Sequence, residues 1–171
     1  MIGIREERAV SELRVLLCGH TGGRNRGCEA IVRTTTSLLN SNGIDCKAMT
    51  FDITGDKNVG LDNVVDLIEY PHKSRFTRAM SLLRRKVLND NIWGSSFYHK
   101  SIITSQRDFN IIFNVGGDTY CYGIPWISIS MNKIAKRENC PTVFWGCSID
   151  ESIENNDIIK EDINNYSYIV A

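Results

Sequence analysis

The sequence has little proline, no net charge and no long hydrophobic stretch. It contains 3 prolines in 171 residues, and its 20 Lys+Arg balance 20 Asp+Glu. With 42% hydrophobic residues, the composition is neither collagen-like nor disordered and is sufficient for a buried core. A chain without net charge has no overall field to hold a polyanion, so we do not expect nucleic acid as its main partner.

Membrane-spanning and targeting segments are also missing. No apolar run approaches the roughly 18 residues that a membrane-spanning helix needs. The first eight residues, MIGIREER, are charged where a signal peptide would have an apolar stretch. We therefore expect a cytoplasmic protein.

Closely spaced cysteine pairs are absent. The 6 cysteines contain no CxxC, so the sequence predicts neither a zinc knuckle nor a thioredoxin-type redox pair. We expect reduced thiols that lie mostly in the core. No spacing of residues supports a metal site, and no motif indicates a cofactor.

Short apolar runs alternate with helical patterns along the chain. Strands are predicted at 14–19, 46–53, 64–70, 109–115, 141–147 and 168–171, and helices at 29–42, 76–88, 126–138 and 157–166. Residues 55–60 read as a polar turn and 92–106 as partly helical. Strands that alternate with helices imply parallel pairing through right-handed crossovers. The expected fold is therefore α/β: one domain, 1–171, with a Rossmann-like parallel sheet and flanking helices.

The end of the sequence lies inside a strand pattern. Residues 168–171 (YIVA) form an apolar run with no further segment to cover it. This pattern predicts that the chain is a piece of a longer protein.

The first candidate site follows the first predicted strand. Its segment, GHTGGRNRGCEAI, combines glycines that allow close backbone approach with the start of a helix. The spacing fits neither GxGxxG nor a P-loop. His20, Asn25 and Glu29, with two arginines between them, suit an anionic ligand rich in hydroxyls. The alternative is structural: Asn25 and Glu29 cap the helix, and His20 bonds a loop carbonyl.

The second candidate site, NVGGDTYCYG, follows the predicted strand at 109–115. Gly116 and Gly117 would bring backbone amides to a ligand, and Asp118 would accept hydrogen bonds or protons from hydroxyls. Tyr120 and Tyr122 would stack on a sugar ring. In the alternative interpretation the glycines make a tight turn, Asp118 caps a helix and the tyrosines pack at the rim.

These two segments, together with WGCSI at 145–149, resemble the polysaccharide pyruvyl transferase family, and the resemblance covers the whole chain. Asn25, Gly27 and Glu29 match the family's first motif, although Cys28 stands where aspartate is usual. Gly116-Gly117-Asp118 fits the variant of the second motif in which an acid follows two glycines.

The resemblance implies a two-domain enzyme of the glycosyltransferase-B type, of which this chain is the N-terminal half. Such enzymes transfer a pyruvyl group from phosphoenolpyruvate to two hydroxyls of one sugar in a surface polysaccharide or its precursor, forming a ketal. Arg and His of the second domain would hold most of the donor, without a metal or other cofactor. On the acceptor side, the two candidate catalytic carboxylates would be Glu29 and Asp118. The substrate-binding residues would be His20, Asn25, Gly116, Gly117 and Tyr120.

Two other functions remain open from the sequence. One is a nucleotide-sugar glycosyltransferase of similar architecture, and the other is a glycan-binding module without chemistry. A separate feature is the predicted helix at 76–88, which has apolar residues on one face and basic residues on its flanks. It is either a solvated helix or a contact with an anionic inner-membrane surface. Association with further copies of the chain is a further expectation.

Overall fold

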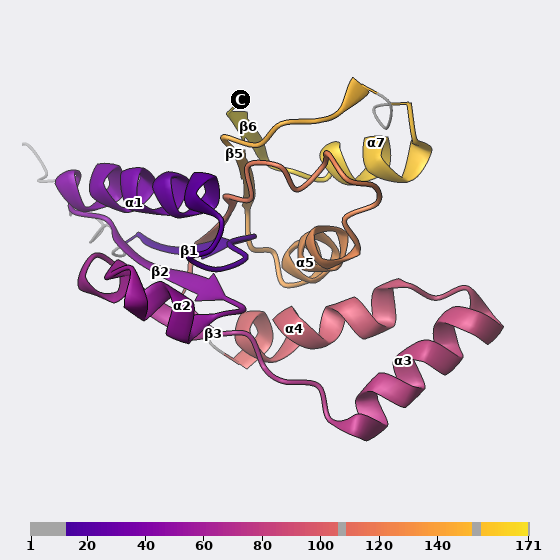
Figure 1. The fold of residues 1–171 in the computed structure, drawn as a ribbon. Coiled ribbons are helices and arrows are strands. Elements are labelled where there is room, and N and C mark those ends of the chain that lie inside the picture. The colour runs from indigo at the N-terminus through magenta and orange to yellow at the C-terminus, as the bar shows by residue number, and fades with distance from the viewer. Residues whose placement is uncertain (1–12, 106–108, 152–154, 171) are drawn as a thin grey trace, which may run out of the picture.

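A computed structural model describes residues 13–105, 109–151 and 155–170 (Figure 1). The charged first residues, Gln106 and Ala171 lie outside the described residues. The elements in chain order are β1 (Arg14–Cys18), α1 (Arg26–Ser41), β2 (Asp45–Thr50), α2 (Ile53–Asn58), the 3-10 helix η1 (Leu61–Asn63), β3 (Asp66–Glu69), α3 (Arg75–Leu88), α4 (Ile92–Ser105), β4 (Ile111–Asn114), α5 (Trp126–Arg137), β5 (Thr142–Trp145), α7 (Asp157–Ile163) and β6 (Tyr168–Val170).

The strands form one parallel sheet of six, in the order β3-β2-β1-β4-β5-β6. The predicted α/β class and Rossmann-like parallel sheet are confirmed. After β1 the chain builds outward through β2 and β3, and then returns to place β4 on the other side of β1. The strand order therefore reverses between β1 and β4, which makes this the switch point of the sheet.

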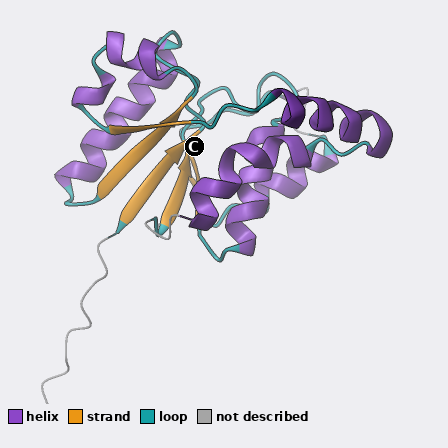
Figure 2. Cartoon of the chain, turned by 90° about the horizontal axis from the view of Figure 1, so that it is seen from below, coloured by secondary structure: helices purple, strands orange, loops and turns teal. Residues whose placement is uncertain are grey.

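Alternate residues of each central strand enter two separate cores. Val15 and Leu17 of β1 pack with Val32 of α1 on one face. Leu16 of β1 packs with Met131 of α5 on the other face. Figure 2 shows the helices gathered in two groups on either side of the strands. Because strand side chains alternate in direction, both faces of the sheet need an apolar cover, and the helices supply it.

The predicted polar turn at 55–60 is wrong in part, because most of it belongs to helix α2. Asp52 Oδ1 accepts a hydrogen bond from the Gly55 backbone N–H at 2.9 Å and so caps this helix. The first turn of this helix contains Asp56, which is completely buried. Asp52, which belongs to the strand predicted at 46–53, is thus a capping residue, and Asp56 of the predicted turn makes a buried polar contact with His20.

The helices α3 and α4 form a hairpin at the edge of the molecule (Figure 1). Residues 92–105, predicted as partly helical, are helical throughout in α4. Among the described residues, none of the helices has the length and apolar character to cross a membrane.

A buried polar network ties the second half of the sheet to its helices. The Tyr120 hydroxyl donates a hydrogen bond to Asp162 Oδ2 at 2.7 Å and lies 2.8 Å from the Tyr166 hydroxyl. Asn132 Nδ2 donates to the other carboxylate oxygen of Asp162 at 2.9 Å, and Asn114 Nδ2 donates to the Tyr166 hydroxyl at 2.6 Å. Burial raises the pKa of Asp162 above its ordinary value. The network joins β4, α5 and α7 through groups that water does not reach.

We predict that Tyr120→Phe destabilises the fold. The substitution leaves the buried Asp162 carboxylate without one of its two side-chain donors. A lost hydrogen bond to a charged group costs about 1.5–3 kcal/mol. The free energy of unfolding from urea titration followed by circular dichroism measures the effect.

Tyr122→Phe is the matched control, because it removes the same hydroxyl from a side chain that is 86% exposed. Its free energy of unfolding should stay within about 0.5 kcal/mol of the wild-type value. Equal stability of Tyr120→Phe and Tyr122→Phe would show that the network does not stabilise the fold.

Candidate functional site

A pocket of about 580 Å³ opens where the loops after β1 and β4 meet, and we call it the switch-point pocket. In sheets of this kind, ligands bind beyond the carboxyl ends of the strands where the strand order reverses. Four strand-end loops, α4 and the start of α5 contribute its lining. The lining residues are Gly19, Thr21, Asn25, Phe51, Tyr70, Ser95, Asp118, Thr119, Tyr122, Ile124, Pro125, Trp126, Ile127 and Ser128.

Two glycines allow the loops after β1 and β4 to touch. Gly19 has φ +94°, and a β-carbon there would lie 2.5 Å from Asn114 Oδ1 and 2.9 Å from the Gly116 nitrogen. A β-carbon on Gly116 would lie 2.9 Å from the Gly19 carbonyl oxygen. No larger residue fits at either position without displacing backbone. The two candidate segments, about a hundred residues apart, therefore form one site.

Aromatic side chains make much of the pocket wall. The rings of Phe51 and Tyr70 stack with centroids 4.0 Å apart and planes 14° apart. Tyr98 of α4 meets both rings edge-on, with centroid distances of 5.2 and 5.9 Å. Trp126 and Tyr122 line the pocket from the segment that follows β4. Such a wall offers flat apolar surface to a ligand that also carries polar groups.

The site residues predicted from the sequence did not include Phe51, Tyr70 and Trp126. Each follows a strand or begins a helix, where an aromatic residue usually packs in the core. Phe51 and Tyr70 lie near the carboxyl ends of the strands predicted at 46–53 and 64–70, and this nearness to the carboxyl edge of the sheet was the signal available for them. Trp126 begins the helix predicted at 126–138 and had no such signal.

Asn25 and Asp118 bring polar chemistry to the pocket from its two glycine-containing loops. The Asn25 side-chain oxygen caps α1 by accepting a hydrogen bond from the Cys28 backbone N–H at 3.2 Å. Asp118 is half-buried at the other wall. Burial and then the charge of Asp118 raise the pKa of the Cys28 thiol, so this carboxylate lies near the first turn of α1.

Glu29 does not line the pocket, because arginines hold both of its carboxylate oxygens. Arg26 Nη1 donates to Oε2 at 2.7 Å, and Arg33 Nε donates to Oε1 at 2.8 Å. These hydrogen bonds lower the pKa of Glu29 below its ordinary value. Arg33 also donates from Nη2 to the Val59 carbonyl at 2.6 Å. Glu29 thus helps to join α1 to the segment after α2.

His20 and Tyr120 are not placed as the sequence analysis expected, because both side chains are completely buried. His20 Nε2 lies 2.9 Å from Asp56 Oδ1, which is also buried. The Tyr120 ring packs against Phe144 at a centroid distance of 5.2 Å. Neither side chain lines the pocket, so Tyr120 offers no ring for a sugar in this arrangement.

Gly116 and Gly117 hold the loops together. The Gly116 backbone N–H points to Asn114 Oδ1 at 3.5 Å, and Gly116 is buried. The Gly117 carbonyl accepts a hydrogen bond from the Ser148 backbone N–H at 2.7 Å, which connects the loops after β4 and β5. These observations favour the structural interpretation of the two glycines.

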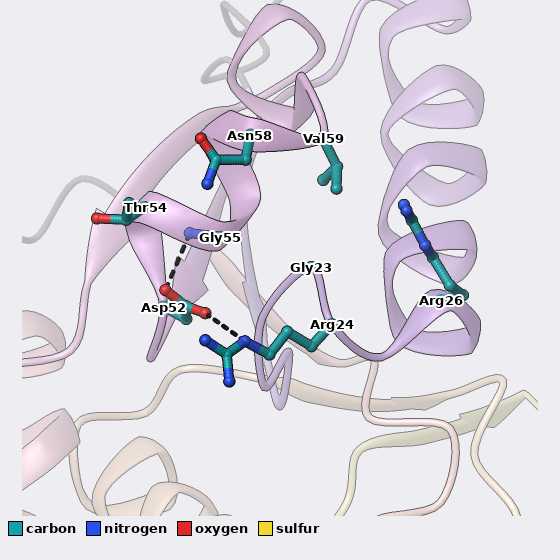
Figure 3. Close-up of a pocket in the computed structure, with 8 residues that line it drawn as sticks. All are labelled: Gly23, Arg24, Arg26, Asp52, Thr54, Gly55, Asn58 and Val59. Carbon is teal, nitrogen blue, oxygen red and sulfur yellow. Dashed lines mark hydrogen bonds and ion pairs between the residues drawn. The ribbon is translucent and has the colours of Figure 1, made fainter.

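The two exposed arginines of the first segment line a different hollow (Figure 3). This second pocket, of about 430 Å³, lies between the loop after β1 and helix α2. Arg24 Nε lies 3.7 Å from Asp52 Oδ2, and the Arg24 side chain is 94% exposed. The expected mixture of cations and hydroxyl-binding groups is therefore divided between two pockets. Within the described parts of the chain, His, Cys, Asp and Glu side chains form no cluster of three that would hold a metal ion.

No protein-family model matches the chain, and no curated protein matches it. Among solved structures, it is similar to MurG from Acinetobacter baumannii, a protein of the GT-B fold, with a TM-score of 0.49 and 8% identity over 92% of this chain and 40% of that one. It is also similar to a predicted subunit of a tRNA methyltransferase from Methanocaldococcus jannaschii, with a TM-score of 0.42 and 10% identity over 88% of this chain and 74% of that one. The chain thus spans less than half the length of MurG. These similarities assign no family and no activity.

We predict that Glu29 makes the stability of the fold depend on acid pH. Its pKa in the folded state is below the ordinary 4.5, so the folded state favours the carboxylate form. The resulting stabilisation is present above pH 4.5 and is lost as the pH falls through the lower, folded-state pKa. The free energy of unfolding should fall less steeply below this pH in Glu29→Gln than in the wild type, as measured by urea titration at several pH values.

Glu161→Gln is the charge-matched control, because its side chain is 67% exposed. Its acid-pH profile should run parallel to that of the wild type. A Glu29→Gln profile that is also parallel to the wild type would contradict the role of the two arginines.

Proposed function

We propose that the switch-point pocket binds a sugar acceptor and that the chain is the acceptor-side half of a polysaccharide pyruvyl transferase. The observation that carries this proposal is the composition of the pocket. A carboxylate and an amide from the two motifs that resemble this family line one hollow, together with Phe51, Tyr70 and Trp126.

This combination suits a sugar ring. The apolar faces of a pyranose pack on aromatic rings, and its hydroxyls need acceptors and donors at the edges. Asp118 supplies acceptors, and hydroxyl side chains such as Thr119 and Ser95 supply both functions. A sugar in the pocket would therefore meet partners for both its apolar and its polar surface.

The charge of the pocket favours an acceptor over a phosphate-bearing donor. Among the residues that the structure describes, its lining includes Asp118 and no Lys, Arg or His. Phosphoenolpyruvate carries a carboxylate and a phosphate, and both need cations or oriented donors. We therefore assign the neutral acceptor to this pocket and most of the donor contacts to a second domain, as the family resemblance implies.

The reaction needs a base on the acceptor side. One sugar hydroxyl forms a C–O bond to C2 of the enolpyruvyl group, and C3 takes up a proton to become a methyl group. A second hydroxyl of the same sugar then attacks C2, the bond from C2 to the phosphate oxygen breaks, and the second proton leaves with phosphate or to water. We assign the base that takes the hydroxyl proton to Asp118, because both carboxylate oxygens of Glu29 are held by arginines.

We predict that Asp118→Asn abolishes most turnover in the full-length enzyme. The amide keeps the size of the side chain and cannot take a proton. Loss of a general base lowers the rate by about a hundredfold or more. The assay is phosphate release from phosphoenolpyruvate in the presence of the acceptor polysaccharide. Turnover within about threefold of the wild type would exclude Asp118 as the base.

Asp62→Asn, a substitution at an exposed residue of η1, is the matched control and should leave turnover unchanged. Two other outcomes would overturn the proposed reaction. Consumption of a nucleotide sugar in place of phosphoenolpyruvate would indicate a glycosyltransferase. Binding of the polysaccharide without consumption of either donor would indicate a glycan-binding module.

A further inference from the structure

Helix α3 turns its apolar face away from the molecule. Five apolar residues recur at helical spacing and lie on one side of the helix: Phe76, Ala79, Met80, Leu83 and Val87. Phe76 is 74% exposed, Leu83 53% and Val87 68%. None of the residues of α3 is buried. In an ordinary surface helix this face would pack on the core.

The side of α3 that meets the protein is small and polar. A β-carbon on Gly94 of α4 would lie 2.7 Å from the Ser81 hydroxyl oxygen, so the two helices approach closely at Ser81. Arg84 pairs with Asp90 at 2.9 Å and lies over the Trp93 ring at 5.4 Å. Among the described elements, α3 packs mainly on α4, which separates it from the rest of the molecule (Figure 1). The contacts of α3 with α4 therefore use its polar side and leave its apolar face pointing outward.

The charge of α3 is of one sign. Five of the chain's 20 basic residues lie in it, and none of the 20 acidic residues does. The rest of the chain has 15 basic residues against 20 acidic ones. The zero net charge of the chain is therefore the sum of a strongly basic helix and an otherwise acidic protein. The basic residues of α3 are Arg75, Arg78, Arg84, Arg85 and Lys86.

We infer that α3 docks on an anionic lipid surface, with its apolar stripe at the acyl boundary and its arginines at the headgroup phosphates. A helix with one apolar face, a basic flank and no acidic residue has the character of an interfacial membrane helix. A second copy of the chain fits this face poorly. A symmetric dimer through α3 would bring the four basic residues that do not pair with Asp90, Arg75, Arg78, Arg85 and Lys86, close to the same four of the other copy.

Docking would hold the switch-point pocket close to the membrane. Ser95 and Trp126 line this pocket and also a small cavity of about 150 Å³, whose other lining residues include Ser81 and Arg85 of α3. If the proposed function holds, the consequence is access to a sugar carried on a membrane lipid. The docking itself does not depend on that reaction, and its test uses no substrate.

The test is sedimentation of the chain with vesicles. Vesicles of phosphatidylcholine with about one third phosphatidylglycerol should sediment the wild type, and vesicles of phosphatidylcholine alone should not. Two triple variants, Arg75→Gln/Arg78→Gln/Arg85→Gln and Phe76→Gln/Leu83→Gln/Val87→Gln, should each weaken binding about tenfold or more. The altered side chains are exposed, so circular dichroism should show both variants folded.

The charge-matched control removes three exposed basic residues from α5: Lys133→Gln/Lys136→Gln/Arg137→Gln. It should bind within about twofold of the wild type, because most apolar residues of α5 are buried and its charges flank no exposed apolar stripe. Failure of the wild type to sediment, or equal loss in the α5 variant, would overturn the inference. So would a lipid-free dimer, seen by analytical ultracentrifugation, that dissociates when Phe76, Leu83 and Val87 are replaced. Phosphate release by the enzyme on a lipid-free acceptor tests the proposed function separately.

Discussion

The pairing of β1 with β4 is the constraint on which the rest of this structure depends. Cys18 at the end of β1 lies opposite Asn114 at the end of β4, so the chain leaves both strands at the same level. Helix α1 then packs on one face of the sheet and α5 on the other. Divergence to opposite faces opens a space between the two loops. Gly19, which lines the pocket in this space, and Gly116 allow the backbones of the two loops to approach closely.

The distribution of charge around that space gives the two carboxylates of the sequence motifs different roles. Arg26 and Arg33 hold Glu29 in the first turns of α1, and these bonds lower its pKa. Arg24 lies toward Asp52 at the neighbouring pocket. Asp118 lines the switch-point pocket, and the described residues that line it with Asp118 include no Lys, Arg or His. The pocket is therefore suited to a neutral ligand with hydroxyls, and this is the physical basis for assigning an acceptor to it.

The hairpin of α3 and α4 connects the pocket with an outer surface. Helix α4 contributes Ser95 to the lining of the pocket and Tyr98 to the aromatic cluster beside it. Its partner α3 buries no apolar residue and so gains little from packing on the body of the molecule. Helix α3 packs mainly on one neighbour and turns its apolar face outward. A partner surface that buries this face is the best explanation of that arrangement.

Apolar periodicity in the sequence is enough to predict the fold class and most elements of this protein, because it reports which side of a strand or helix is buried. The sequence also located Asn25 and Asp118 at strand ends. It did not predict α2, whose start depends on the Asp52 cap and whose first turn carries a buried Asp56 beside His20. Tertiary structure alone decided that His20 and Tyr120 are core residues, that Glu29 is held by arginines, and that Phe51, Tyr70 and Trp126 join one pocket. Local pattern specifies which residues prefer burial, whereas the partner that each meets depends on contacts between distant segments.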